Sequence, residues 1–140
     1  MTKLLKIMSP ANVLEENLAS ACIICLFAGK FLVGYNNWCK QWEVPAGKRE
    51  PQETIFETAQ REFLEETHQT LTDLKLVKIA KIQDKITRFR AVFLGTIAAP
   101  IPFVKEDQDE MDKIAFCTWD ELDQMNVDEL DLQILKIVMR

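Results

Sequence analysis

The sequence predicts an α/β fold, a sandwich in which a mixed β-sheet lies between layers of helices. Three features predict it: strand-like segments on both sides of one internal helix-like segment, a helix-like pattern at the end of the chain, and an apolar fraction of 48%, which is ample for one core. Strands around an internal helix and closed by another helix give a mixed sheet with helices on both sides. With 140 residues, the chain is expected to form a single domain over residues 1–140.

The first strands are predicted as a hairpin. Residues 20–27 form an apolar run typical of a buried strand, and residues 28–30 form a tight turn. Residues 31–36 are the expected partner of that strand. A short strand at residues 42–44 then leads into a loop at residues 45–47.

The internal helix is expected over residues 51–67. Pro51 suits the first helical turn, where a missing N–H does no harm. Glu53, near the same end, is favoured by the helix dipole. An apolar stripe is spaced for packing on a core, and it consists of Ile55, Phe56, Ala59 and Phe63.

Three glutamates are predicted to share the opposite face of this helix. Glu62, Glu65 and Glu66 stand at positions i, i+3 and i+4, where Cβ atoms are about 5–6 Å apart. Like charges this close repel one another. A hard divalent cation would offset that cost, because Mg²⁺ takes carboxylate oxygens and keeps waters and substrate phosphates as its other ligands. The pattern therefore favours a site for metal and diphosphate over a solvated acidic helix.

The rest of the chain completes the sandwich. Further strands are expected at residues 74–83, 86–98 and 114–118, and short helices at residues 119–124 and 127–139. The last helix carries an apolar stripe consistent with docking on a sheet, formed by Leu130, Ile134, Ile137 and Val138.

Composition and charge restrict the function classes. The chain lacks a long apolar run that would predict a transmembrane helix, and its N-terminal segment lacks the features of a signal peptide. The net charge of −5 argues against a general nucleic-acid binder. Cys22 and Cys25 have opposite parity on a buried strand, so a zinc or redox pair is disfavoured. Free cysteines suggest a cytoplasmic location.

The stretch from Gly47 to Gln69 resembles the signature of the Nudix hydrolases, Gly-x5-Glu-x7-Arg-Glu-U-x-Glu-Glu-x-Gly-U, in which U is a bulky aliphatic residue. The glycine, the first glutamate and the Arg-Glu-x-x-Glu-Glu run fall in register over this Nudix box (residues 47–69). The box departs from the signature at its end, where His68 and Gln69 replace the glycine and the aliphatic residue. His68 is expected to end the helix with a positive φ, and Leu71 to supply the aliphatic anchor.

The resemblance implies a Nudix α/β/α sandwich and attack of water on a phosphorus of a diphosphate, with Mg²⁺ or Mn²⁺ as the cofactor. It implies metal ligation by the carbonyl of Ala46 and by Glu62, Glu65 and Glu66. Glu65 and Glu66 also count as catalytic candidates, and Glu110 is favoured as general base over Glu106 or a box glutamate. Arg61 is expected to pair with Glu53 and to lock the loop to the helix, while Lys48, Arg88 and Arg90 are candidates for phosphate contacts or a solvated face.

The resemblance further implies a nucleotide as the small-molecule substrate. MutT-like members and the small size of the chain favour a nucleoside triphosphate, with an oxidised purine such as 8-oxo-dGTP as one candidate. Residues 84–87 carry neither the proline nor the tyrosine that marks some other subfamilies. ADP-ribose hydrolysis, pyrophosphate removal from RNA 5′ ends and a non-catalytic nucleotide sensor stay open as alternatives. The chain is expected to act as a monomer or homodimer without a membrane partner.

Overall fold

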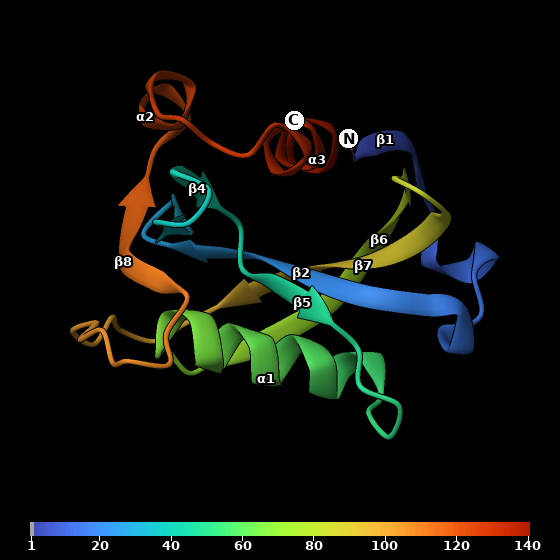
Figure 1. Cartoon of the computed structure of the whole chain (residues 1–140), viewed down its shortest axis with the longest axis horizontal. Coiled ribbons are helices and arrows are strands. Elements are labelled where there is room, and N and C mark those ends of the chain that lie inside the picture. The colour runs from blue at the N-terminus through green and yellow to red at the C-terminus, as the bar shows by residue number, and fades with distance from the viewer. Residues whose placement is uncertain (1) are drawn as a thin grey trace.

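The chain folds into a mixed eight-stranded sheet with helices on both faces, as the computed structural model describes it for residues 2–140. The predicted α/β/α sandwich is confirmed. Figure 1 shows α1 on one side of the sheet and α2 and α3 on the other. The elements in chain order are β1 (Lys3–Met8), β2 (Leu18–Phe27), β3 (Lys30–Asn36), β4 (Gln41–Glu43), β5 (Ala46–Lys48), α1 (Ile55–Thr67), β6 (Asp73–Gln83), β7 (Thr87–Thr96), β8 (Met111–Cys117), α2 (Trp119–Gln124) and α3 (Glu129–Met139), with short 3-10 helices at Pro10–Asn12 and Glu15–Asn17.

The central strand β2 organises the sheet. It runs parallel to β7 on one edge, and on its other edge it pairs with β3 at one end and with β5 at the other. The main path of strands is β1-β6-β7-β2-β3-β4, with β8 paired to β3. Because Ala46 stands opposite Cys22 and Gly47 opposite Ala21, the start of the Nudix box is fixed to the middle of the sheet.

Each face of the sheet has its own apolar core. Ile55, Ala59 and Phe63 of α1 pack with one set of sheet residues, which includes Cys25. Leu130, Ile134 and Leu135 of α3 pack with the other set, which includes Cys22. The prediction that the two cysteines point to opposite faces is therefore confirmed.

Capping hydrogen bonds start the internal helix at Ile55, later than the predicted start at residue 51. The structure begins α1 at Ile55, because Thr54 accepts the N–H of Glu57 while the Glu57 carboxylate accepts the N–H of Thr54. Pro51 therefore lies in the preceding loop, and its predicted place in the first helical turn is wrong. At the other end, His68 adopts φ 60° and ψ 18°, which confirms the predicted positive φ. Leu71 packs against the α1 core, as expected.

Four further differences from the sequence predictions concern short strands and stripe residues. Neither β1 nor β5 was predicted, since their ladder partners lie far away in the sequence. Phe56 is 42% exposed and keeps an edge-on contact with Phe93, with ring centroids 5.0 Å apart. Ile137 is 55% exposed, because the buried face of α3 is centred near Ile134 and leaves Ile137 at its edge. None of the helices in residues 2–140 has the length and apolar character needed to cross a membrane.

Replacement of Phe63 by alanine tests the packing of α1 on the sheet. Phe63 is fully buried, so truncation should lower the free energy of unfolding by about 3–5 kcal/mol through lost transfer energy and a residual cavity. Its neighbour Leu64 is 53% exposed, and Leu64→Ala should cost less than about 1 kcal/mol. Urea denaturation of both variants measures the difference, and equal costs would contradict the assignment of the buried face.

Candidate active site

The strand β5 lies against α1 and forms the floor of the candidate site. The N–H of Ala46 donates a hydrogen bond of 2.8 Å to Oε1 of Glu66. At Gly47 an added Cβ would overlap the carboxyl group of Glu62, so glycine leaves the space that this carboxyl group occupies beside the strand. Two glutamates of the Nudix box are thereby held under the strand that begins the box.

The position of these glutamates corrects the expectation of an acidic face opposite the core. Glu62 and Glu66 follow Ile55 by seven and eleven residues, close to two and three full helical turns. They therefore border the buried face of α1 and are half-buried, whereas Glu65 is exposed. The spacing from Ile55 was visible in the sequence and could have predicted this placement.

Arg61 joins the loop before α1 to the helix, as predicted. Its Nε lies 2.5 Å from Oε2 of Glu53, and its Nη2 donates to Oε1 of Glu53 at 2.9 Å and to the carbonyl of Lys48 at 3.0 Å. The hydrogen bond from Arg61, with a further one from the N–H of Glu50, lowers the pKa of Glu53 to about 2. The carboxylate of Glu53 therefore stays charged across the physiological range and holds residues 48–53 against the helix.

Arg61 also contacts two of the box glutamates. Its Nη1 lies 2.7 Å from Oε1 of Glu62 and 3.4 Å from Oε2 of Glu65. One guanidinium is thus shared among Glu53, Glu62 and Glu65. It compensates the cluster only in part, because Glu66 has no such cation partner among the ion pairs of residues 2–140.

Glu66 carries the strongest electrostatic cost in the site. Burial raises the pKa of Glu66 to about 9, against the hydrogen bond from Ala46, and the negative charges of Glu62 and Glu110 add to the effect. Burial also raises the pKa of Glu62, although the hydrogen bond from Arg61 opposes it. A carboxylate so placed is favoured in its charged form only if a positive charge comes close.

The residues at this position fit a hard divalent cation. Within residues 2–140, no group of three or more His, Cys, Asp or Glu side chains is already gathered in a ligating geometry. The donors present are carboxylate and carbonyl oxygens, which are the ligands that Mg²⁺ and Mn²⁺ prefer. The uncompensated burial of Glu66 is the observation that calls for a cation, and Glu62, Glu65 and the carbonyl of Ala46 are the predicted further ligands.

Two cavities meet at Glu66. The first, of about 410 Å³, is lined on the α1 side by Glu62, Glu65, Glu66 and the helix cap His68, and on the other side by Gln108, Asp109 and Glu110. The structure thus brings Glu110, the predicted general base, to the same cavity as the three box glutamates. Glu106, the alternative base, does not line this cavity. We name this the acidic cavity.

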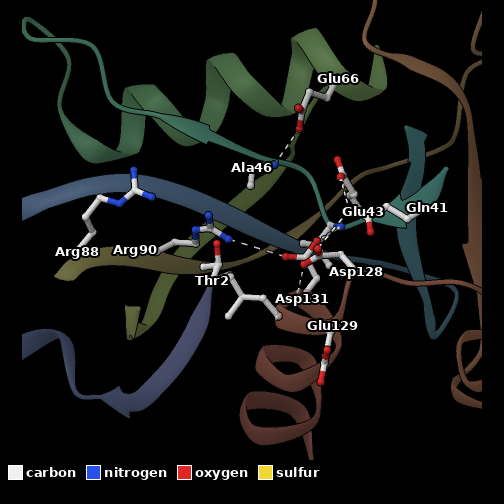
Figure 2. A pocket seen from close by; sticks show the side chains of 12 residues that line it. Thr2, Gln41, Glu43, Ala46, Glu66, Arg88, Arg90, Asp128, Glu129 and Asp131 are labelled. Atoms are coloured by element: carbon white, nitrogen blue, oxygen red, sulfur yellow. Dashed lines mark hydrogen bonds and ion pairs between the residues drawn. The ribbon is translucent and has the colours of Figure 1, made fainter. Parts of the chain in front are cut away.

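The second cavity, of about 430 Å³, lies between the sheet and the start of α3. Figure 2 shows Glu66 and Ala46 at one end of it, and Arg88 and Arg90 on the side away from Gln41 and Glu43. We name it the polar cavity. Sequence reasoning did not predict it, and its principal polar residues are Gln41, Glu43, Arg88, Arg90, Asp128 and Asp131.

Asp131 is a buried residue of the polar cavity that was not predicted from the sequence. It is 6% exposed, accepts the N–H of Val44 at 2.9 Å and lies 3.8 Å from Nη1 of Arg90. Burial raises the pKa of Asp131 to about 7, the negative charge of Asp128 adds to the rise, and Arg90 and the N–H of Val44 oppose it. An aspartate inside the apolar stripe of the last helix was the signal in the sequence, because such residues are rarely buried without a partner.

The two arginines of β7 have partners within the protein. Nε of Arg90 donates to Oγ of Ser20 at 3.2 Å, and Arg88 forms an ion pair with Asp84. Nε of Arg88 is buried and has no hydrogen-bond partner among the described residues. Both arginines line the polar cavity, and both also reach a neighbouring cleft beside Gly47 and Lys48. Arg88 and Arg90 share one face of β7, as predicted, and two cations therefore lie near Ala46.

Asp131 gives the stability of the protein a pH dependence that can be measured. Its pKa is about 4 in an unfolded chain and about 7 in the folded protein, so the folded state binds more protons between these values. This contribution to stability is complete below pH 4 and is lost as the pH rises to about 7, at up to about 1.4 kcal/mol per pH unit. Asp131→Asn retains an acceptor for Val44 and should reduce the slope, while the part that comes from the raised pKa of Glu66 remains.

Urea denaturation between pH 4.5 and pH 8 measures this slope for the parent chain and the variant. Asp123→Asn is the matched control, since the side chain of Asp123 is 45% exposed and pairs only at the surface with Lys136. Its slope should equal that of the parent. An unchanged slope for Asp131→Asn would contradict the raised pKa of Asp131.

Comparison with known proteins places the chain in a family. A family model of the NUDIX domain matches residues 16–138. No match was found among curated proteins. Similar solved structures include a Nudix hydrolase from Nitrosomonas europaea, with 24% identity, 84% of each chain covered and a TM-score of 0.71.

Two further structures share the fold. A pyrophosphohydrolase from Bacillus subtilis has 20% identity, covers 94% of this chain and 89% of its own, and gives a TM-score of 0.71. A MutT Nudix hydrolase from Burkholderia pseudomallei has 19% identity, covers 86% of this chain and 96% of its own, and gives a TM-score of 0.72. At these identities the structures show the shared fold, and the family model covers most of the chain. This chain therefore belongs to the Nudix family.

Proposed function

We propose that this chain is a Mg²⁺- or Mn²⁺-dependent pyrophosphohydrolase of nucleoside triphosphates. The observation that carries the proposal is that Glu66 borders both the acidic cavity and the polar cavity. A nucleotide that spans Glu66 would have its diphosphate beside the box glutamates and its nucleoside in the polar cavity. This division of the site supports a substrate that joins a nucleoside to a diphosphate.

The acidic cavity supplies the chemistry at the phosphates. Glu62, Glu65, Glu66 and the carbonyl of Ala46 would hold the metal, which lowers the pKa of the attacking water and neutralises charge that builds on the phosphates. Glu110 faces these residues across the cavity and is the proposed general base that takes the proton of the water. Arg61 and Glu53 act indirectly, because they fix the loop that leads from Ala46 into the helix.

The polar cavity supports a purine as the nucleoside end. Its volume of about 430 Å³ falls within the range of small-ligand sites. Glu43, Asp128 and Asp131 make its lining rich in hydrogen-bond acceptors. Such a lining matches a base edge that presents N–H donors, as guanine and its oxidised form do. Arg88 and Arg90 at the opposite side offer cations to phosphate oxygens.

A panel of nucleotides tests the proposed activity. Purine nucleoside triphosphates, 8-oxo-dGTP, ADP-ribose, diadenosine polyphosphates and RNA with a 5′-triphosphate are incubated with the protein and Mg²⁺, and release of phosphate or pyrophosphate is measured. The highest kcat/KM is expected for a purine nucleoside triphosphate, and excess chelator should abolish release because the glutamates then lack their cation. Binding of a nucleotide without release from any member would favour the sensor alternative.

Replacement of Gly47 by alanine tests the close approach of β5 and α1. The new Cβ would displace the Glu62 carboxyl group, and activity should fall by about 10–100-fold, as for other residues that position metal ligands. The fold should survive, since Gly47 has ordinary strand dihedrals. Steady-state kinetics at several Mg²⁺ concentrations measure the loss, and a melting curve serves as the control. Full activity at the Mg²⁺ requirement of the parent chain would refute the role of Glu62.

A further inference from the structure

The loop between β7 and β8 is attached to the end of α1 by the two residues that depart from the family signature. We name residues 97–110 the β7–β8 loop. Figure 1 shows this loop, in orange, beside the C-terminal end of α1. The loop ends at Glu110, one residue before β8 begins at Met111.

Gln69 makes the first attachment. Its side chain is buried, with 1% of the residue exposed, and its amide meets the backbone of Ile101 on both sides. Oε1 accepts the N–H of Ile101 at 2.8 Å, and Nε2 donates to the carbonyl of Ile101 at 2.9 Å. This pairing resembles the contact between neighbouring strands. The aliphatic residue of the signature has neither a donor nor an acceptor with which to form it.

His68 makes the second attachment. Its ring stacks on Phe103, with centroids 4.3 Å apart and planes at 26°, and its Nε2 lies 3.0 Å from Oδ2 of Asp109. The same carboxylate oxygen accepts the N–H of Glu106 at 2.8 Å, which closes the last turn of the loop. His68 holds φ 60°, where glycine is less strained, so the histidine side chain is retained at a conformational cost.

These contacts hold the loop on the N-terminal side of Glu110, and β8 begins at Met111 on its other side. Asp109 is the residue held by His68, and Glu110 follows it directly and lines the acidic cavity with Glu62 and Glu66. The negative charge of Glu110 is felt by both of those glutamates, so the loop brings a further carboxylate toward a cluster that repels it. The contact between His68 and Asp109 opposes this repulsion.

We propose that His68 and Gln69 are positioning residues that hold the β7–β8 loop against α1 and thereby keep Glu110 at the acidic cavity. The kinetic consequence rests on the proposed function, in which Glu110 takes a proton from water. Neither residue is assigned a contact with the reacting atoms. The departure from the signature at the end of the Nudix box thus replaces a plain helix stop by an anchor for a distant loop.

Two substitutions restore the residue types of the signature and remove the anchor. His68→Gly relieves the positive φ, so α1 should end as before and the melting temperature should not fall through backbone strain. Gln69→Leu introduces an apolar side chain of similar size and leaves the backbone of Ile101 without these two hydrogen bonds. Hydrogen exchange read by mass spectrometry compares peptides from residues 99–110 with control peptides from β6.

Each variant should accelerate exchange in residues 99–110 by roughly 10-fold or more, because lost hydrogen bonds raise the population of open loop. Exchange in β6 should stay the same. Unchanged exchange at residues 99–110 in both variants would overturn the proposal. This measurement requires no substrate, so it decides the attachment even if no nucleotide on the panel is hydrolysed.

Kinetics then test whether the anchor acts through Glu110. His68→Gly should lower kcat by about 10–100-fold, as small misplacements of a catalytic group do, while KM changes little. In a Glu110→Gln background, the same substitution should cause little further loss, because residues that act through one another are not additive. Faster exchange with full kcat, or equal losses in both backgrounds, would overturn the positioning role. If Glu110→Gln alone leaves kcat intact, the general base of the proposed function is wrong, and exchange still reports on the attachment.

Discussion

The carboxylate of Glu66 lies beneath β5 and accepts the N–H of Ala46, and the other parts of the site are arranged around that contact. The contact requires a strand that reaches the helix without side chains in between, which Gly47 permits at the next residue. It also requires that a charged group be buried, which is unfavourable unless the group is protonated or paired with a cation. The geometry that joins strand to helix therefore also creates the demand for positive charge.

Arg61 shows why that demand is not met by the protein itself. The guanidinium could neutralise Glu66 only by leaving Glu53 and the carbonyl of Lys48, which it binds at the outer edge of the site. Those contacts keep the loop that carries Ala46 and Gly47 in place. The arginine of the Arg-Glu-x-x-Glu-Glu run, Arg61, is thus committed to the backbone path, and the inner carboxylates remain for a cation from solution.

Features that are written locally can be predicted from the sequence, whereas those that depend on distant partners cannot. The capping pair Thr54 and Glu57 and the seven- and eleven-residue spacing from Ile55 to Glu62 and Glu66 are local, and a closer reading would have corrected both the helix start and the acidic face. The strand β5 has only three residues and no apolar alternation, so its pairing with β2 defines it. The polar cavity joins β4, β7 and α3, and no sequence spacing relates these segments.

The end of the Nudix box is a second feature that depends on distant partners and is therefore misjudged from the sequence. His68 and Gln69 look in the sequence like a weakened helix stop, because glycine is the usual residue at positive φ. Ile101, the partner of Gln69, lies 32 residues further along the chain, and Asp109, the partner of His68, lies 41 residues further along. The sequence alone therefore shows the strain at His68 but not the contacts that offset it. A strained residue persists only where its surroundings over-determine it. Here the surroundings are a loop that ends at Glu110, and the strain at the end of α1 therefore belongs to the same structural arrangement as the carboxylates of its last two turns.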